Sequence, residues 1–271
     1  MFVHFALFFF AVCSLATSLP SRPAPSPRII GGHDVAPFSI PYQAIVFSRY
    51  DDINQWGGGV LVSSSFVLAA AFVILDVYGE TTREVDVFLG VKNFSSELPE
   101  PSRQLIKAEQ WWIHDDDVTP SETLALVKLS TPAVLNEYVG LPKLPTNAFK
   151  NSDFVGSSAV ISGFGYTASD ELPGVIQVAE LPIVAMRKCE EYFGVNKLDN
   201  DLFICGYEAN ANRGANTGDQ GGPLTIDGVL YGITYEMAGF DIDYDYQSLF
   251  LNLWYFKDWI EQTSEGAVVF A

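Results

Sequence analysis

Short apolar segments that end at glycine, proline, asparagine or aspartate recur along this chain, and they limit the folds available to it. No helical pattern of about 10–15 residues lies between them, which argues against alternating strands and helices. The spacing therefore predicts an all-β chain of antiparallel barrels or sandwiches. A helical pattern occurs late, at residues 254–263. The predicted strands cover residues 42–47, 59–62, 85–89, 124–129, 159–162, 176–181 and 229–234.

The composition favours a large buried core and excludes two classes of partner. Of the 271 residues, 48% are hydrophobic and 18% are charged, which is typical of a chain that folds. Asp and Glu number 33 against 15 Lys and Arg, so the formal net charge is −18. Because so acidic a chain cannot neutralise many phosphates, we expect no nucleic-acid partner and no attachment to an anionic membrane surface.

The N-terminus has the pattern of a secretory leader. Residues 2–13 form an apolar run that is too short to span a bilayer, and small residues follow it. We therefore predict a signal peptide at residues 1–18, cleaved after Ala16 or Ser18, in preference to a buried N-terminal helix. No later stretch reaches transmembrane length, so a soluble, secreted and extracellular protein without a membrane span is expected.

A proline- and serine-rich segment separates this leader from the rest of the chain. Residues 19–28 lack apolar periodicity and are predicted to form a short, extended or disordered propeptide. The composition changes abruptly after Arg28, where a domain covering residues 29–271 begins. A basic residue at the end of an exposed linker favours proteolytic processing, so cleavage after Arg28 is expected.

Seven short motifs occur in order, and their combination is far more specific than any one of them. They are Arg28-Ile29-Ile30-Gly31-Gly32, Pro41-Tyr42-Gln43, Gly58-Gly59, Val67-Leu68-Ala69-Ala70-Ala71, Leu124-Ala125-Leu126, Ser162-Gly163-Phe164-Gly165 and Gly218-Asp219-Gln220-Gly221-Gly222-Pro223-Leu224. Together they resemble the landmarks of chymotrypsin-like and trypsin-like (S1 family) serine proteases. The end of the chain is similar to invertebrate chymotrypsins and crustacean digestive collagenases. The resemblance covers residues 29–263 and implies two packed six-stranded antiparallel β-barrels, an active site between them and a C-terminal helix.

At the three positions that carry catalysis in this family, the resemblance places other residues. Gln220 stands where the nucleophilic serine is expected, Phe72 where the histidine is expected and Thr123 where the aspartate is expected. A carboxamide is not a useful nucleophile near neutral pH, and a phenyl ring cannot accept a proton. Between residues 29 and 271 the only histidines are His33 and His114, and neither is placed to activate a hydroxyl beside residue 220. The resemblance thus implies that no catalytic residue is intact and that the chain is not an active enzyme.

Other parts of the family's site are implied to survive. Gly218 and Gln220 match the residues whose backbone N–H groups form the oxyanion hole. Asp219 matches the acid that pairs with the new α-amino group after activation, which here would belong to Ile29 once the chain is cut after Arg28.

The substrate pocket is implied to be less well preserved. Gly214 matches the pocket floor, whereas Tyr235, Glu236 and Met237 replace the strand that binds substrate backbone in the family. Met237 stands in place of a glycine of the pocket wall and is expected to plug the pocket partly.

The cysteines fit an oxidising compartment. Cys13 leaves with the leader, and Cys189 and Cys205 match the family's disulfide across the intermediate loop, which we predict to be the only one. The positions of two other common bridges of the family lack both cysteines: Gly57 with Val73, and Asn216 with Ile242.

Two further motifs concern modification and metal binding. Asn93-Phe94-Ser95 is an N-glycosylation acceptor in a predicted surface loop. His114 is followed by three aspartates, but a single histidine beside solvated acids favours a surface turn over a metal site. We expect no metal and no cofactor.

These features favour a secreted, inactive protease homologue that acts by binding a protein, as a regulatory cofactor, a decoy for inhibitors or a recognition protein. The alternatives are an endopeptidase with residual or unconventional activity and an extracellular structural protein. Candidates for an aromatic binding patch are Tyr235, Phe240, Tyr244 and Tyr246, for which packing within their loop is an equal alternative.

Overall fold

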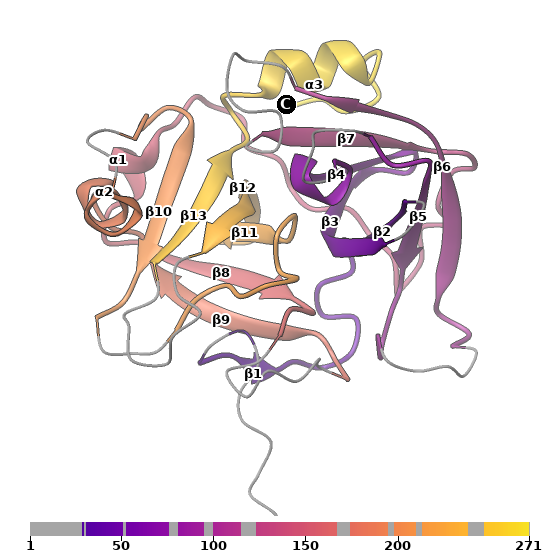
Figure 1. The fold of residues 1–271 in the computed structure, drawn as a ribbon, viewed down its shortest axis with the longest axis horizontal. Coiled ribbons are helices and arrows are strands. Elements are labelled where there is room, and N and C mark those ends of the chain that lie inside the picture. The colour runs from indigo at the N-terminus through magenta and orange to yellow at the C-terminus, as the bar shows by residue number, and fades with distance from the viewer. Residues whose placement is uncertain are drawn as a thin grey trace, which may run out of the picture.

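Two β-sheet units lie side by side in the molecule, and the C-terminal helix lies along one end (Figure 1). The computed structural model describes residues 29, 31–50, 53–75, 81–94, 100–114, 123–166, 174–194, 198–209, 213–237 and 247–270. The predicted leader and propeptide, residues 1–28, lie outside the described residues. Within the part that is described, no helix is long and apolar enough to cross a membrane.

The first unit is a closed antiparallel barrel with the strand order β2-β3-β4-β7-β6-β5. Its interior holds small and β-branched side chains, which pack well on a pleated surface, and Leu61, Val67, Val87 and Val127 are almost fully buried there. A short 3-10 helix, η1 (Ala71–Val73), follows β4 directly. The strands are β2 (Gln43–Arg49), β3 (Asn54–Ser63), β4 (Phe66–Ala70), β5 (Glu84–Leu89), β6 (Gln104–Ile113) and β7 (Leu124–Leu129).

The second unit is a seven-stranded antiparallel sheet with the order β1-β9-β8-β11-β12-β13-β10. Six of its strands curl into a barrel that closes through one isolated bridge, between Ile183 and Gly206. A Cβ on Gly206 would lie 2.5 Å from a methyl carbon of Leu181, so a larger residue here would force the Leu181 side chain to shift. The strands are β1 (His33–Asp34), β8 (Ser158–Gly163), β9 (Gln177–Pro182), β10 (Phe203–Tyr207), β11 (Pro223–Ile226), β12 (Val229–Met237) and β13 (Gln247–Asn252).

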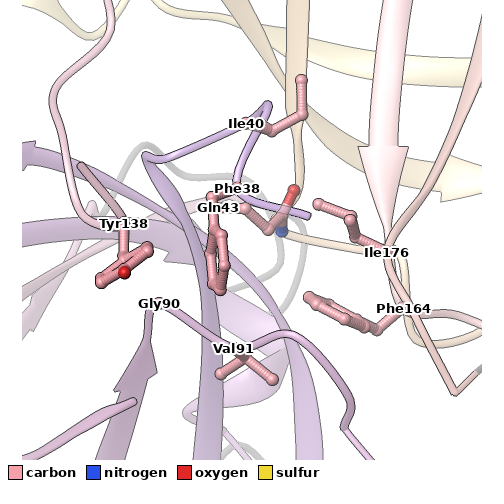
Figure 2. A pocket seen from close by; sticks show the side chains of 8 residues that line it. All are labelled: Phe38, Ile40, Gln43, Gly90, Val91, Tyr138, Phe164 and Ile176. Carbon is pink, nitrogen blue, oxygen red and sulfur yellow. The ribbon is translucent and has the colours of Figure 1, made fainter. Parts of the chain in front are cut away.

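A small cavity of about 10 Å³ lies between the two units. Figure 2 shows that side chains from the N-terminal segment and from both units surround it. Nearby, the Ser162 hydroxyl of β8 donates a 2.8 Å hydrogen bond to the Gln43 side chain of β2, so the contact between the units is polar as well as apolar. The cavity has room for about one water molecule and is therefore too small for an organic ligand. Its lining residues are Phe38, Ile40, Gln43, Gly90, Val91, Tyr138, Phe164 and Ile176.

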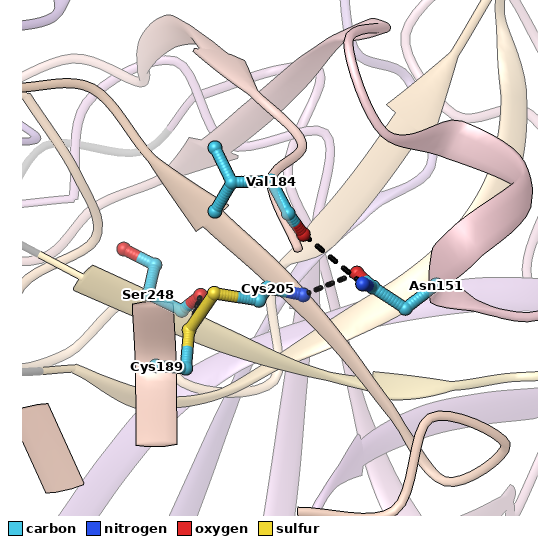
Figure 3. The surroundings of a disulfide bond; sticks show 5 residues. All are labelled: Asn151, Val184, Cys189, Cys205 and Ser248. Atoms are coloured by element: carbon cyan, nitrogen blue, oxygen red, sulfur yellow. Dashed lines mark hydrogen bonds between the residues drawn. A yellow bond between two sulfur atoms is a disulfide. The ribbon is translucent and has the colours of Figure 1, made fainter. Parts of the chain in front are cut away.

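The predicted disulfide between Cys189 and Cys205 is confirmed, with an Sγ–Sγ distance of 2.03 Å. It joins helix α2 (Arg187–Phe193) to strand β10 (Figure 3). The buried Asn151 side chain, on the one-turn helix α1 (Asn151–Phe154), reinforces this corner. It donates to the Val184 carbonyl at 3.0 Å and accepts from the Cys205 N–H at 2.9 Å.

Each of the seven predicted strands overlaps an observed strand, and the expected pair of antiparallel barrels is confirmed. The sequence reasoning did not predict β1, β4, β6, β10, β11, β13, α1 or α2. Strand β4 is a continuous buried run, and such runs lack the alternation that marks a half-buried strand. The C-terminal helix, α3, covers Lys257–Thr263 and so begins later than predicted, because residues 253–256 form turns.

Removing the disulfide by the double substitution Cys189→Ala/Cys205→Ala should destabilise the protein by about 3 kcal/mol. The two cysteines are 16 residues apart, so the cross-link restricts a loop of that length in the unfolded chain. Urea unfolding followed by tryptophan fluorescence measures the change. An unchanged unfolding midpoint in the variant would contradict the prediction.

Candidate functional site

The turn at residues 216–222 is the centre of the candidate site. The Asp219 N–H donates to the Asn216 carbonyl at 2.9 Å, and the Gly222 N–H donates to the Asp219 carbonyl at 2.8 Å. Gly218 and Gly221 have φ angles of +93° and +87°, which residues with a side chain rarely adopt. The glycines of the predicted motif are therefore required by the backbone path of the turn.

The Gln220 side chain folds back onto this turn. Its Oε1 atom accepts a 2.8 Å hydrogen bond from the Gly218 N–H, which is one of the two groups predicted to form an oxyanion hole. The Gln220 backbone carbonyl meanwhile accepts a 2.7 Å hydrogen bond from the Gly58 N–H on β3. Residue 220 thus occupies one of the two predicted donors with its own carboxamide and ties the turn to the first barrel.

Glycines on β3 allow the turn to come this close. A Cβ on Gly58 would lie 2.6 Å from the Gly222 nitrogen. A Cβ on Gly57 would lie 2.8 Å from the Gln220 carbonyl oxygen and 2.6 Å from a methyl carbon of Val73. Gly57 therefore lies between the Gln220 turn and η1, and it brings these two predicted parts of the site together.

The segments that carry Phe72 and Thr123 are joined by a backbone hydrogen bond, which the Ala71 N–H donates to Thr123. Phe72 is half-buried in the middle of η1, and its carbonyl accepts a 2.5 Å hydrogen bond from the Gln55 side chain. Thr123 immediately precedes β7 and is 3% exposed. Its backbone carbonyl accepts the hydrogen bond from the Ala71 N–H at 2.9 Å. None of the side chains of Phe72, Thr123 and Gln220 exchanges a proton readily near neutral pH.

The histidines lie on other elements. His114 follows β6, and its ring packs edge-on against Phe256 and Trp259 at centroid distances of 4.9 and 5.2 Å, beside and on helix α3. His33 is exposed on β1 and pairs with Val178 of β9. The three aspartates after His114 lie outside the described residues, and the ranges that are described contain no cluster of three or more potential metal ligands.

Asp219 is a buried acid held by neutral groups. Its side chain accepts 2.8 Å hydrogen bonds from the N–H groups of Gly165 and Asn216. A Cβ on Gly163 or Gly165 would lie 2.0 or 2.6 Å from the carboxyl group, so glycines also form its cradle. Burial raises the pKa of the Asp219 carboxyl to about 7, although the two backbone N–H donors lower it. The neutral form of the Asp219 carboxyl is therefore favoured up to a much higher pH than that of an exposed aspartate.

The remaining activation residues are placed in part. The Ile29 side chain is fully buried in the core of the second barrel, whereas Arg28 lies outside the described residues. An ion pair between the Ile29 α-amino group and Asp219, which requires cleavage after Arg28, stays a prediction.

The residues predicted to line a specificity pocket are described only in part. Gly214 is buried, and the Tyr235 ring packs against Phe203 with a centroid distance of 5.6 Å. Glu236 and Met237 pair with β13. Their side chains lie outside the described part, as do Phe240, Tyr244 and Tyr246, so the plugging of the pocket by Met237 stays a prediction.

The sequence reasoning missed Trp56, which lies against the turn from the first barrel. A Cβ on Gly218 would be 2.4 Å from the Trp56 ring, so this glycine is required for packing as well as for its backbone angle. Trp56 also packs against Phe94, with a centroid distance of 4.8 Å. A tryptophan directly before three consecutive glycines was the signal available in the sequence, because such glycines indicate a close backbone approach.

The predicted glycosylation acceptor Asn93 lies in a loop with several fixed contacts. Its N–H donates to the Glu100 carboxylate at 2.9 Å, and its carbonyl accepts from Arg103 at 2.7 Å. Asn93 is half-buried, and Ser95 of the acceptor triplet lies outside the described residues. Glycosylation at Asn93 stays a prediction.

Comparisons with known proteins agree with this architecture. The sequence profile of the family described as Trypsin matches residues 29–260, starting at the residue that follows Arg28. The chain is 29% identical over 242 residues to brachyurin of Leptuca pugilator, covering 88% of this chain and 99% of that protein. It is 27% identical over 249 residues to a chymotrypsin of Phaedon cochleariae, covering 89% and 84% of the two chains. It is 31% identical over 236 residues to glandular kallikrein-10 of Rattus norvegicus, covering 83% and 86%.

The burial of Asp219 should make the intact chain less stable as the pH rises from 4 to 7. An unfolded aspartate has a pKa near 3.9, whereas the folded value is about 7, so the folded chain binds more protons across this interval. Its stability should fall by about 1.4 kcal/mol per pH unit through this group, on the order of 4 kcal/mol in total. Urea unfolding of the wild type and of Asp219→Asn at several pH values measures the difference.

The asparagine variant serves as a matched comparison because it keeps the size of the side chain and does not titrate. Any misfit between its amide and the Gly165 or Asn216 N–H is constant with pH. Only the change with pH in the difference between the two free energies of unfolding reports the titration of Asp219. Parallel pH profiles for the two proteins would contradict the prediction, because they would show that the Asp219 carboxyl is already ionised at pH 4.

The double substitution Gly57→Cys/Val73→Cys should create a second disulfide. A Cβ on Gly57 would lie 3.8 Å from the Val73 Cβ, which is the mean separation in disulfides. Part of the gain is lost because the new Cβ crowds the Gln220 carbonyl, so we expect a stabilisation of about 1–3 kcal/mol that a reducing agent abolishes. Non-reducing peptide mapping and urea unfolding measure both effects, with Val73→Cys alone as the control. Two free thiols in the secreted double variant would contradict the pairing.

Proposed function

The chain belongs to the trypsin family of serine proteases, and we propose that it is a secreted, catalytically inactive member that acts by binding another protein. The proposal assigns Phe72, Thr123 and Gln220 to the positions of the catalytic histidine, aspartate and serine. Its binding role would be that of a regulatory cofactor for an active protease, a decoy for a protease inhibitor or a recognition protein.

The observation that carries the proposal is the state of Gln220. Acyl transfer by this mechanism needs a hydroxyl nucleophile and free N–H donors for the developing oxyanion. Residue 220 supplies a carboxamide, and that carboxamide accepts the Gly218 N–H at 2.8 Å. A bound substrate would therefore meet neither a nucleophile at this position nor a free Gly218 donor.

The described residues assigned to the two other catalytic positions offer no general base in compensation. Phe72 presents a phenyl ring, and Thr123 presents a hydroxyl that is nearly inaccessible, with the residue 3% exposed. His114 packs beside α3 against Phe256 and Trp259. Since general-base catalysis requires hydrogen-bonding reach to the nucleophile, residual endopeptidase activity is the weaker candidate.

Secretion and a binding role rest on the preserved scaffold. The Cys189–Cys205 disulfide fits an oxidising compartment, as does the leader pattern at residues 1–18. The chain keeps the glycines that place the turn at Gln220 against β3, although a chain without catalysis does not need an oxyanion hole. Retention of this geometry supports a surface that is still used for recognition.

The protein cleaved after Arg28 should hydrolyse no peptide or ester substrate above the rate of a denatured control. A phosphonyl fluoride, which labels activated serines, should not modify it, as intact-mass spectrometry can show. Gln220→Ser restores the hydroxyl without a base and should stay unlabelled as well. Stoichiometric labelling of any residue in the wild type would refute the proposed inactivity.

Binding is tested separately, with the cleaved protein immobilised and exposed to the native secretion from which it comes. We expect one protease or protease inhibitor to be retained at equal stoichiometry and to be released by denaturant, because no acyl bond can form with Gln220. The unfolded, reduced protein is the control. A covalent complex would indicate a reactive nucleophile and favour the enzyme alternative.

A further inference from the structure

The chain continues past the segment that it shares with its family. The family profile ends at residue 260, within helix α3, whereas the structure describes the chain as far as Phe270. Glu265 and Gly266 have φ angles of +54° and +78°, and these left-handed residues reverse the chain after the helix. The C-terminal tail, residues 264–270, therefore folds back onto the molecule.

Alternate side chains of the C-terminal tail enter the core. Val268 and Phe270 are 1% and 7% exposed, whereas Val269 between them is 56% exposed. The Phe270 ring lies edge-on to Trp254, with the two ring centroids 6.1 Å apart. Because burial removes both apolar side chains from water, it favours the docked position of the tail.

Glu261 joins the C-terminal tail to α3. Its Oε1 atom accepts the Phe270 N–H at 3.0 Å, and its Oε2 atom pairs with Lys257 Nζ, one helical turn earlier, at 2.7 Å. The Val268 N–H donates to the Ser264 hydroxyl at 3.1 Å. The backbone N–H groups of both buried tail residues are thus hydrogen-bonded, as buried backbone requires.

The core that receives the tail belongs to both barrels. The hydrophobic cluster that contains Val268 and Phe270 draws side chains from β3, β4 and β7 of the first barrel and from β10, β12 and β13 of the second. On its outer side the tail lines an open groove, where Val269 lies beside Val62 of the first barrel and Val229 of the second. The tail is therefore anchored where the two barrels pack together.

Two strands lead from this shared core to the candidate site. Strand β3 places Val60 in the core and, two residues earlier, Gly58 against the Gln220 carbonyl at 2.7 Å. Strand β12 places Ile233 in the core, and the next carbonyl along the strand accepts the Gly221 N–H at 2.8 Å. Since protein cores are close-packed, a change in the shared core displaces both strands.

We propose that the C-terminal tail is a strap that holds the two barrels at the spacing on which the candidate site depends, with the Glu261 carboxylate as its latch. While the tail is docked, Val268 and Phe270 complete the shared core, and the contact between Gly58 and Gln220 stays closed. When the tail is released, the shared core loses both side chains and this contact opens locally, whereas each barrel keeps its fold. The strap acts through packing and does not depend on whether the protein is an enzyme.

Hydrogen exchange of Phe270→Ala, followed residue by residue by NMR, tests the proposal. The internal reference is the set of amides in β8 and β9, whose side chains pack in a separate core cluster. Relative to that reference, the Gly58 and Gly221 amides should exchange about tenfold faster in the variant than in the wild type. The matched control is Val269→Ala, which truncates the exposed neighbour and should leave this ratio unchanged.

The latch is tested by comparing Glu261→Ala with Asp258→Ala. Both remove an acid of α3 that pairs with Lys257, but Glu261 also bonds the tail. Glu261→Ala should raise the same exchange ratio about threefold, and Asp258→Ala should leave it unchanged. Equal effects of the two substitutions would overturn the role of Glu261 as the latch.

A second substitution at the same position keeps the test decisive if Phe270→Ala fails to fold. Phe270→Leu leaves a smaller cavity and should raise the exchange ratio in the same direction. An unchanged ratio in the folded Phe270 variants would overturn the strap. Equal acceleration of the Gly58, Gly221, β8 and β9 amides would overturn it as well, because it would show a general loss of stability without local opening of the contact.

Discussion

The close approach of two backbones, from β3 of the first barrel and from the turn at residues 216–222, is the constraint on which the candidate site depends. The hydrogen bond from the Gly58 N–H to the Gln220 carbonyl spans 2.7 Å. A Cβ on Gly58 or Gly221 would lie within 3 Å of a backbone atom of the facing segment. Any larger residue at these positions would separate the two units where they meet, because backbone atoms cannot yield as flexible side chains do.

The glycine cradle of Asp219 is costly to maintain. A buried carboxyl without a cation shifts its pKa toward neutrality, as burial does here. Its two backbone hydrogen bonds only partly offset the lost hydration. Such a group persists where it fixes a particular arrangement, and here it joins the end of β8 to the turn that presents Gln220. The scaffold and the catalytic groups of this family are therefore separable: the first depends on glycines and one acid, and the second on three side chains that the chain replaces in our proposal.

Local patterns in the sequence predicted an all-β chain but not every strand, and the resemblance to the protease family supplied the pair of barrels and the disulfide. Residues 85–89 were assigned correctly because Val85, Val87 and Leu89 alternate along the segment and are buried. Strand β4, fully buried, and β1, only two residues long, carry no such alternation. Within the site, the resemblance assigned roles to Gly218, Asp219 and Gln220. It could not predict that the Gln220 carboxamide bonds the Gly218 N–H or that Trp56 covers Gly218, because both depend on side-chain rotamers and on contacts between segments distant in sequence.

The bond between the Gln220 carboxamide and the Gly218 N–H has a consequence for any ligand that would enter this site. The carboxamide is tethered two residues from its donor, so it competes as an intramolecular group with an effective concentration in the millimolar range or above. An incoming carbonyl that offers the Gly218 N–H a single hydrogen bond gains almost nothing by displacing it. Ligands are then selected for contacts made elsewhere on the surface, and affinity becomes insensitive to the acyl group that a protease of this family would recognise first.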